Sequence, residues 1–164
     1  LQDRTGSAGL SRSLTPYERR MIMEPYFHLE FDSSSPNEAF ARAAVCAFAA
    51  RLDPTLEELD DIRTAVSEAV TNAIIHGYAQ EEGAVCLNAR LSGNLLTVSV
   101  EDHGVGMADI RQAMMPLYTS RPDLERSGLG FTLMESFMDS VDVVSTPGSG
   151  TTVTMTKKLG DGTQ

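Results

Sequence analysis

Three polar residues, Glu68, Asn72 and His76, recur at intervals of four within a segment of periodic apolar residues. On a helix, this spacing places them on one stripe beside the apolar stripe that faces the core. An asparagine oxygen is a hard ligand suited to Mg²⁺, which takes few protein ligands and completes its shell with water and phosphate oxygens. A glutamate one turn away could accept a proton from an attacking hydroxyl. Taken alone, the stripe is equally typical of a solvated helix face.

Three glycine-rich groups follow this segment, at residues 102–107, 127–131 and 148–152. The first begins with Asp102 directly after a strand-like run, where a carboxylate can accept a hydrogen bond from an exocyclic amine such as that of adenine. Its glycines, Gly104 and Gly106, let the backbone approach a flat base closely. The second group opens a predicted helix, whose free N–H groups and dipole favour phosphate. Each group alone could be an ordinary turn.

Periodicity and turn signals predict the strands and helices that must position these residues. Strands are expected at residues 26–31, 84–91, 95–100, 141–145 and 151–157. Helices are expected at about residues 36–52, 56–77, 108–115 and 128–137. Ser35 is the expected N-cap of the first helix, and Asp53-Pro54-Thr55 is expected to end that helix and cap the second. This order predicts an α+β fold, a two-layer sandwich with helices on one face of a mixed, mostly antiparallel sheet.

The length and composition favour one domain with a buried core, because the chain has 164 residues of which 41% are hydrophobic. We expect residues 23–159 to form this domain, residues 1–22 to be a disordered leader or cloning remnant, and residues 160–164 to be a tail. The polar stretch 116–127, with two prolines, is typical of a functional lid. No apolar stretch reaches the roughly 20 residues needed to cross a bilayer. A cytoplasmic protein without a membrane partner is therefore expected.

The formal net charge is -10, which argues against direct binding to nucleic acid and favours basic partners. Cys46 and Cys86 are far apart in the sequence, so buried free thiols are expected rather than a disulfide or a metal site. The three histidines are scattered among different predicted elements, which argues against a histidine metal triad.

The motifs Glu-x-x-x-Asn, Asp-x-Gly-x-Gly, Gly-x-Gly and Gly-Thr-Thr, in this order, resemble the Bergerat (GHKL) ATP-binding fold of gyrase, histidine kinases and MutL. The closer resemblance is to the bacterial anti-sigma-factor serine kinases, and especially to the sporulation anti-sigma F factors. Three segments carry it, at residues 52–55, 67–78 and 116–131. The resemblance covers about residues 23–159.

The resemblance implies a role for each matching residue. Asn72 would coordinate Mg²⁺, and Glu68 would be the general base that activates a serine hydroxyl of a protein substrate. Arg126 would contact the terminal phosphate, where a fixed positive charge stabilises the transferring group. Asp102 would bind the adenine amine, and Thr151 would help to hold adenine through water. The remaining residues that would shape the nucleotide pocket are Gly104, Gly106, Ser127, Gly128 and Gly130.

The function implied is that of a homodimeric anti-sigma factor that binds a sigma factor of the F type and phosphorylates an anti-anti-sigma protein on serine with Mg-ATP. Two alternatives stay open. One is a general stress-response switch kinase, with the same chemistry and different partners. The other is a non-catalytic module that binds ATP only as a structural ligand, although the presence of both Glu68 and Arg126 argues against it.

Overall fold

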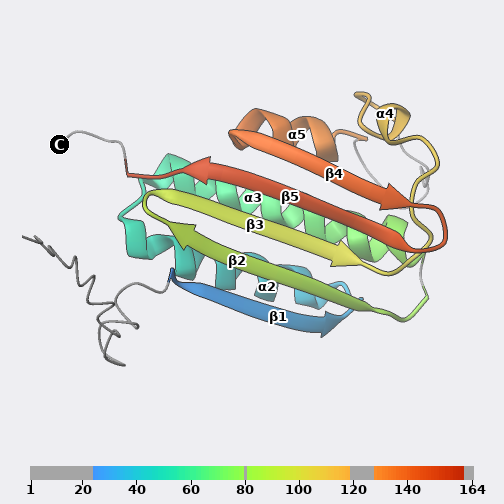
Figure 1. The fold of residues 1–164 in the computed structure, drawn as a ribbon, viewed down its shortest axis with the longest axis horizontal. Coiled ribbons are helices and arrows are strands. Elements are labelled where there is room, and N and C mark those ends of the chain that lie inside the picture. The colour runs from blue at the N-terminus through green and yellow to red at the C-terminus, as the bar shows by residue number, and fades with distance from the viewer. Residues whose placement is uncertain (1–23, 80, 119–127, 161–164) are drawn as a thin grey trace, which may run out of the picture.

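The computed structural model describes residues 24–79, 81–118 and 128–160. Five strands form a single sheet in the order β1-β2-β3-β5-β4, and all four pairings are antiparallel. The strands are β1 (Tyr26–Asp32), β2 (Ala84–Ser92), β3 (Leu95–Asp102), β4 (Ser140–Thr146) and β5 (Gly150–Lys158). Figure 1 shows β1 and β4 at the two edges of the sheet. The expected α+β class is confirmed, and the sheet is antiparallel throughout.

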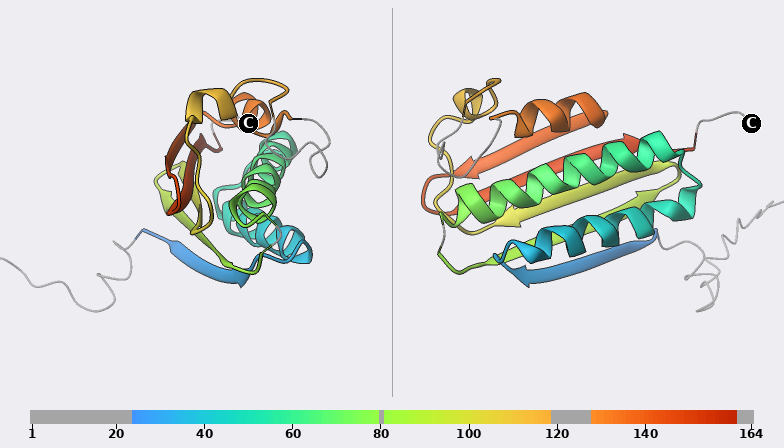
Figure 2. Two further views of the ribbon diagram at one scale, coloured as in Figure 1. Left: turned by 90° about the vertical axis from the view of Figure 1, so that its right-hand side faces the viewer. Right: turned by 180° about the vertical axis from the view of Figure 1, so that it is seen from behind.

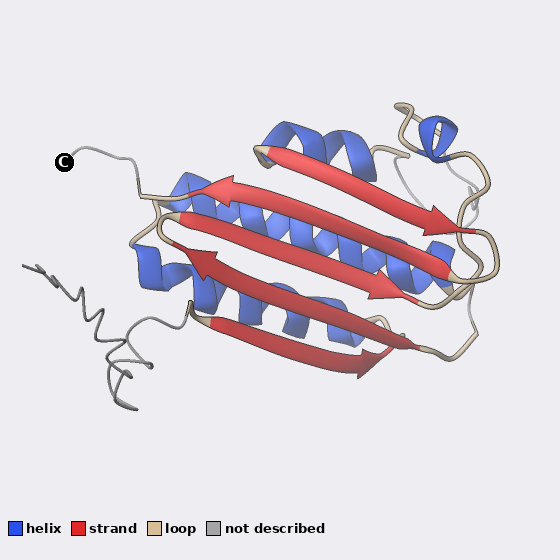
Figure 3. Ribbon diagram, in the orientation of Figure 1, coloured by secondary structure: helices blue, strands red, loops and turns tan. Residues whose placement is uncertain are grey.

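The helices lie on one face of the sheet, so the molecule has two layers (Figure 2). They are α2 (Pro36–Ala49), α3 (Leu56–Asn72), α4 (Ile110–Ala113) and α5 (Gly130–Phe137). A 3-10 turn, Ala50–Leu52, extends α2, and a π-helical turn, Ala73–Gly77, extends α3. The longest helix, α3, lies along the sheet between α2 and α5 (Figure 3).

The core forms between the sheet and the helices because side chains alternate along each strand. On β3, every second residue is buried, and β2 follows the same pattern over most of its length. This alternation gives β2 and β3 one apolar face toward the helices and one polar face toward solvent. The largest fully buried side chains are Ile62, Leu87, Leu96, Met134, Met155 and Leu159.

The two long helices begin differently. Thr55 caps α3 with a reciprocal pair of bonds: its hydroxyl accepts from the Glu58 N–H at 3.1 Å, and the Glu58 carboxylate accepts from the Thr55 N–H at 2.7 Å. Ser35 occupies the N-cap position of α2, but its side chain makes no capping hydrogen bond. Instead, Asp32 accepts from the Ser34 N–H and from the Asn37 side chain at the start of α2.

Several element boundaries differ from the expectations. The helix expected at 108–115 is limited to Ile110–Ala113, and the last helix begins at Gly130 because Gly128 has a φ of +61° that no α-helix contains.

Three further expectations concern the cysteines, the lid and membrane spans. Cys46 and Cys86 are half-buried free thiols, whereas burial was expected. Most of the stretch expected to form a lid, residues 119–127, lies outside the described residues. Among the helices that are described, none combines the length and apolarity needed to span a membrane.

Removing the α3 cap tests the local basis of this helix. Replacing Thr55 with Ala leaves the Glu58 N–H without its side-chain acceptor, and we expect the free energy of unfolding to fall by about 1 kcal/mol. Thr64→Ala is the matched control, because that hydroxyl only donates to the Asp60 carbonyl within the same helix. Chemical denaturation should give a change within about 0.5 kcal/mol for the control. Equal losses in the two variants would contradict the capping role.

Candidate nucleotide-binding site

A cavity of about 300 Å³ lies where the end of α3 meets the loops that follow β3 and precede α5. Its walls come from segments far apart in the sequence, including Asn72 and His76 from α3 and its π turn, Asp102 from β3, Gly130 from α5 and Thr151 from β5. Val100 and Val153 add an apolar floor from the sheet. A mostly apolar cavity with a few polar groups is the usual form of a small-molecule site.

Glu68 and Asn72 meet the start of α5 at Gly130. A Cβ on Gly130 would lie 3.0 Å from Oε2 of Glu68 and 3.4 Å from Oδ1 of Asn72. A side chain at position 130 would therefore press on Glu68 and come into contact with Asn72. The contact places a carboxylate and an amide oxygen beside the first turn of α5, where main-chain N–H groups lack partners within the helix. This arrangement suits a phosphate together with a hard cation.

Asp102 ends β3 and is the one buried polar or charged side chain in the described part of the chain, with 4% exposure. Burial raises the pKa of this carboxyl, while hydrogen bonds from the backbone N–H groups of Gly104 and Thr151 act in the opposite direction. The Gly104 N–H donates to Oδ1 at 3.0 Å. A carboxylate has about four acceptor positions. Two donors therefore leave Asp102 with capacity to accept from a ligand in the cavity.

Two glycines let the loop after β3 pack against the end of α3. The Val105 N–H donates to the Gly77 carbonyl at 2.8 Å, and a Cβ on Gly104 would lie 1.8 Å from that same carbonyl oxygen. A Cβ on Gly77 would lie 2.6 Å from Cγ of Asp102. Neither position has space for a side chain, so both glycines are required for this contact.

The other glycines of the motifs shape the surrounding loops. Gly106 has a φ of +66°, and a Cβ there would lie 2.1 Å from the Thr146 carbonyl oxygen. Gly128 packs against the backbone of Leu117, which would lie 2.8 Å from an added Cβ. Both residues line the cavity.

The structure brings most of the site residues expected from sequence to this one region. Six of them line the cavity: Asn72, Asp102, Gly106, Gly128, Gly130 and Thr151. Glu68 and Gly104 do not line it, but each lies against a residue that does, Gly130 and Gly77 respectively. The Thr151 hydroxyl is 2.8 Å from Oγ of Ser145. Arg126 and Ser127 lie outside the described residues.

Sequence reasoning missed three residues that hold the site together. The Gly77 carbonyl accepts the hydrogen bond that joins the end of the π turn to the loop after β3. The Tyr78 hydroxyl accepts from the His103 N–H at 2.9 Å and donates to the Ala84 carbonyl. Ser145 accepts from the Met107 N–H at 2.8 Å. Gly77 and Tyr78 directly follow His76 in the sequence, so the turn at the end of the helix was the available signal, whereas nothing near Ser145 marked it.

Comparisons with known proteins identify the family of this chain. Residues 34–157 match the model of the histidine kinase-like ATPase domain. Proteins named anti-sigma F factor are similar over most of their length: that of Clostridium beijerinckii is 58% identical over 132 residues, covering 80% of this chain and 92% of the relative. That of Pasteuria penetrans is 59% identical over 133 residues, covering 80% of this chain and 89% of the relative.

A solved structure gives the same fold. The RsbU and RsbW domains of a Mycobacterium tuberculosis protein match with a TM-score of 0.60 and 25% identity, over 82% of this chain. This chain spans 32% of that longer one. The chain therefore belongs to the histidine kinase-like ATPase domain family and, within it, to the anti-sigma F factors.

Proposed function

We propose that this chain binds Mg-ATP, holds a sigma factor of the F type inactive, and phosphorylates an anti-anti-sigma protein on serine. The observation that carries the proposal is the meeting of Glu68 and Asn72 at Gly130, beside the cavity that also contains the buried carboxyl of Asp102. A phosphate-suited region and an adenine-suited region thus share one cavity.

The adenine region is built on Asp102. Its carboxylate is held by two backbone N–H groups and keeps acceptor capacity for the exocyclic amine of adenine. Low exposure strengthens such a bond, because water competes poorly in a site of low dielectric. Thr151 lies next to Asp102 across the β3–β5 pairing and is proposed to help hold the base through water.

The phosphate region is built on the end of α3 and the start of α5. Asn72 offers an amide oxygen suited to Mg²⁺, and Gly128 and Gly130 keep side chains away from the first turn of α5. Ser127 and Arg126 directly precede this turn in the sequence and are proposed to contact the phosphates. The residues present fit the group: Gly130 has no side chain at the point where a Cβ would press on Glu68 and contact Asn72.

Glu68 is proposed as the general base. It lies one helical turn before Asn72, so a serine hydroxyl that enters beside Gly130 comes within reach of its carboxylate. Mg-ATP, when bound, supplies the transferable phosphoryl group and a cation that offsets its charge. Glu68 accepts the hydroxyl proton, while Arg126 is proposed to stabilise the negative charge of the group in transfer.

The proposed partners rest on the relatives and on charge. The similar proteins are named anti-sigma F factor, which favours a sigma factor of that type over a stress-response sigma factor. A net charge of -10 suits basic segments of such a partner. A homodimer and a cytoplasmic location belong to the same proposal.

Asn72→Ala tests the metal ligand. Loss of a ligating oxygen should weaken Mg²⁺-dependent ATP binding by at least about tenfold, since changes outside the first coordination shell already cost that much. Titration calorimetry with and without Mg²⁺ measures this, and Asn88→Ala, on the opposite face of the sheet, is the control. Unchanged affinity in Asn72→Ala would remove this residue as the ligand.

Glu68→Gln tests the base. The variant should bind ATP with near-normal affinity but transfer phosphate to an anti-anti-sigma protein about 10²- to 10⁴-fold more slowly, because an amide cannot accept the proton. A labelled-ATP assay with acid treatment of the product distinguishes phosphoserine from acid-labile adducts. Glu57→Gln, in the first turn of the same helix, should transfer normally. Normal transfer by Glu68→Gln would assign the base elsewhere, and tight binding without transfer by the unaltered chain would favour a purely binding role.

Asp102→Asn tests base recognition. An amide presents a donor where the carboxylate accepts, so ATP affinity should fall by about 10- to 100-fold, the effect of losing a charge-assisted bond. Affinity for GTP relative to ATP should rise, because guanine has a carbonyl in place of the amine. Competition binding with both nucleotides measures the ratio. An unaltered ratio would show that Asp102 does not contact the base.

A further inference from the structure

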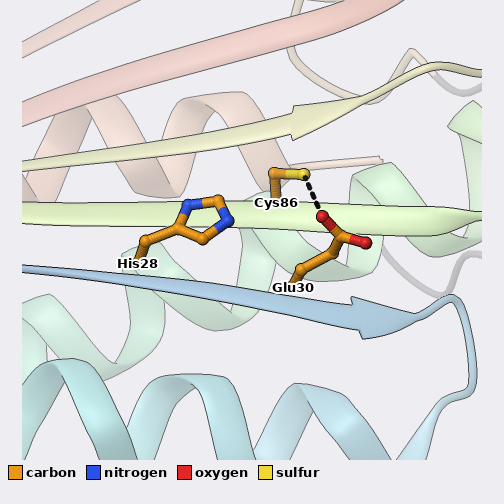
Figure 4. A group of neighbouring side chains, drawn as sticks. All are labelled: His28, Glu30 and Cys86. Atoms are coloured by element: carbon orange, nitrogen blue, oxygen red, sulfur yellow. Dashed lines mark hydrogen bonds between the residues drawn. The ribbon is translucent and has the colours of Figure 1, made fainter.

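The polar outer face of the sheet carries a group of three potential metal ligands at its β1 edge, on the side away from the helices. His28 and Glu30 are two residues apart on β1 and therefore project from the same face. Cys86 on β2 pairs directly with Glu30, and Asn88 pairs with His28. Figure 4 shows the three side chains gathered over these two strands, with one ring nitrogen of His28 directed toward Cys86 and Glu30.

The distances suit a small cation. One ligand atom from each of His28, Glu30 and Cys86 lies within 4.8 Å of the other two, and the Cys86 Sγ is 3.9 Å from Oε2 of Glu30. Atoms bonded to one tetrahedral zinc lie about 3.3–3.8 Å apart, given metal–ligand bonds of about 2.0–2.3 Å. The separations must therefore contract by at most about 1 Å, which rotation of the exposed side chains of His28 and Glu30 can supply.

A contact outside the three residues orients the imidazole. Nδ1 of His28 lies 2.8 Å from the amide oxygen of Asn88, and the amide nitrogen of Asn88 donates to Oγ of Ser99 at 3.4 Å. Because an amide oxygen only accepts, Nδ1 carries the proton, and the lone pair is on Nε2. A metal-binding histidine is typically held in this way, by donating its second ring N–H to an oxygen.

Charge around the group favours a cation. Glu101 on β3 pairs with Cys86 on the side opposite Glu30, so two carboxylates flank the sulfur. The cation on the same face of β2, Arg90, lies 3.6 Å from Glu24 in an ion pair. The whole chain is also acidic, with a net charge of -10.

We propose that His28, Glu30 and Cys86 form a Zn²⁺ site that joins the edge strand β1 to β2. Nε2 of His28, a carboxylate oxygen of Glu30 and the Cys86 sulfur are the protein ligands, and water completes the tetrahedron. Sulfur and imidazole select zinc over Mg²⁺ and Ca²⁺, which prefer oxygen ligands. This proposed role for Cys86 differs from the expectation of a free thiol without a metal. The site is separate from the nucleotide cavity, because Asp102 faces the helices whereas its neighbour Glu101 faces outward.

Zinc titration of the whole chain tests the site. Calorimetry in the presence of excess Mg²⁺ should detect one Zn²⁺ per chain, with binding weakened at least tenfold in Cys86→Ser and in His28→Gln. Cys46→Ser is the matched control, because this second half-buried cysteine lies on α2, and it should bind zinc like the unaltered chain. Unchanged ATP affinity in each variant verifies that the fold is intact.

Co²⁺ provides a spectroscopic readout that a non-specific surface ion would not give. The cobalt-loaded chain should show thiolate-to-cobalt charge-transfer absorption and the visible bands of tetrahedral cobalt, and both should disappear in Cys86→Ser and on addition of Zn²⁺. Zinc should also raise the unfolding temperature of the unaltered chain but not that of Cys86→Ser. Zinc binding that is equal in the chain and in both variants, or a cobalt complex without a thiolate band, would overturn the proposal.

Discussion

Burial of one carboxyl group organises the nucleotide end of this molecule. Asp102 is only 4% exposed, and a charge removed from water is costly unless other groups replace the solvent. Backbone N–H groups of Gly104 and Thr151 do so, which requires the loop after β3 and the start of β5 to approach the carboxyl closely. Gly77 has no side chain at the point where one would collide with it. The loop after β3, the start of β5 and the end of the π turn therefore all pack closely against Asp102.

The helix α3 links this arrangement to the core. Its buried stripe, which includes Val66 and Val70, fixes the helix on the sheet, while Glu68 and Asn72 lie on the adjacent stripe toward α5. The π turn that follows widens the helix. Gly77 is the last residue of this turn, so its carbonyl has no partner within the helix and accepts from the Val105 N–H. Core packing and ligand geometry thus depend on the same seventeen-residue helix.

The two faces of the sheet present different groups because side chains alternate along a strand. At the end of β3, Asp102 faces the helices and the cavity, whereas Glu101 faces outward toward Cys86. One strand can therefore serve a nucleotide site on one face and contribute charge near a proposed zinc site on the other.

The sequence by itself determined most of the elements and predicted most of the residues that the structure brings to the cavity, because these depend on local patterns. Examples are the alternation in β2 and β3, the helix start after Asp53-Pro54-Thr55, and an Asn72 spaced four residues from Glu68. Sequence reasoning missed Gly77 and Ser145, and it treated Cys86 as an isolated thiol. Only the tertiary structure decided the surroundings of these residues, since they depend on contacts between segments distant in the sequence. Examples are the contact of Gly77 with the loop after β3 and the pairing of Cys86 with Glu30. The physical reason is that local periodicity sets which face a residue occupies, whereas strand register and loop packing set which residues it meets.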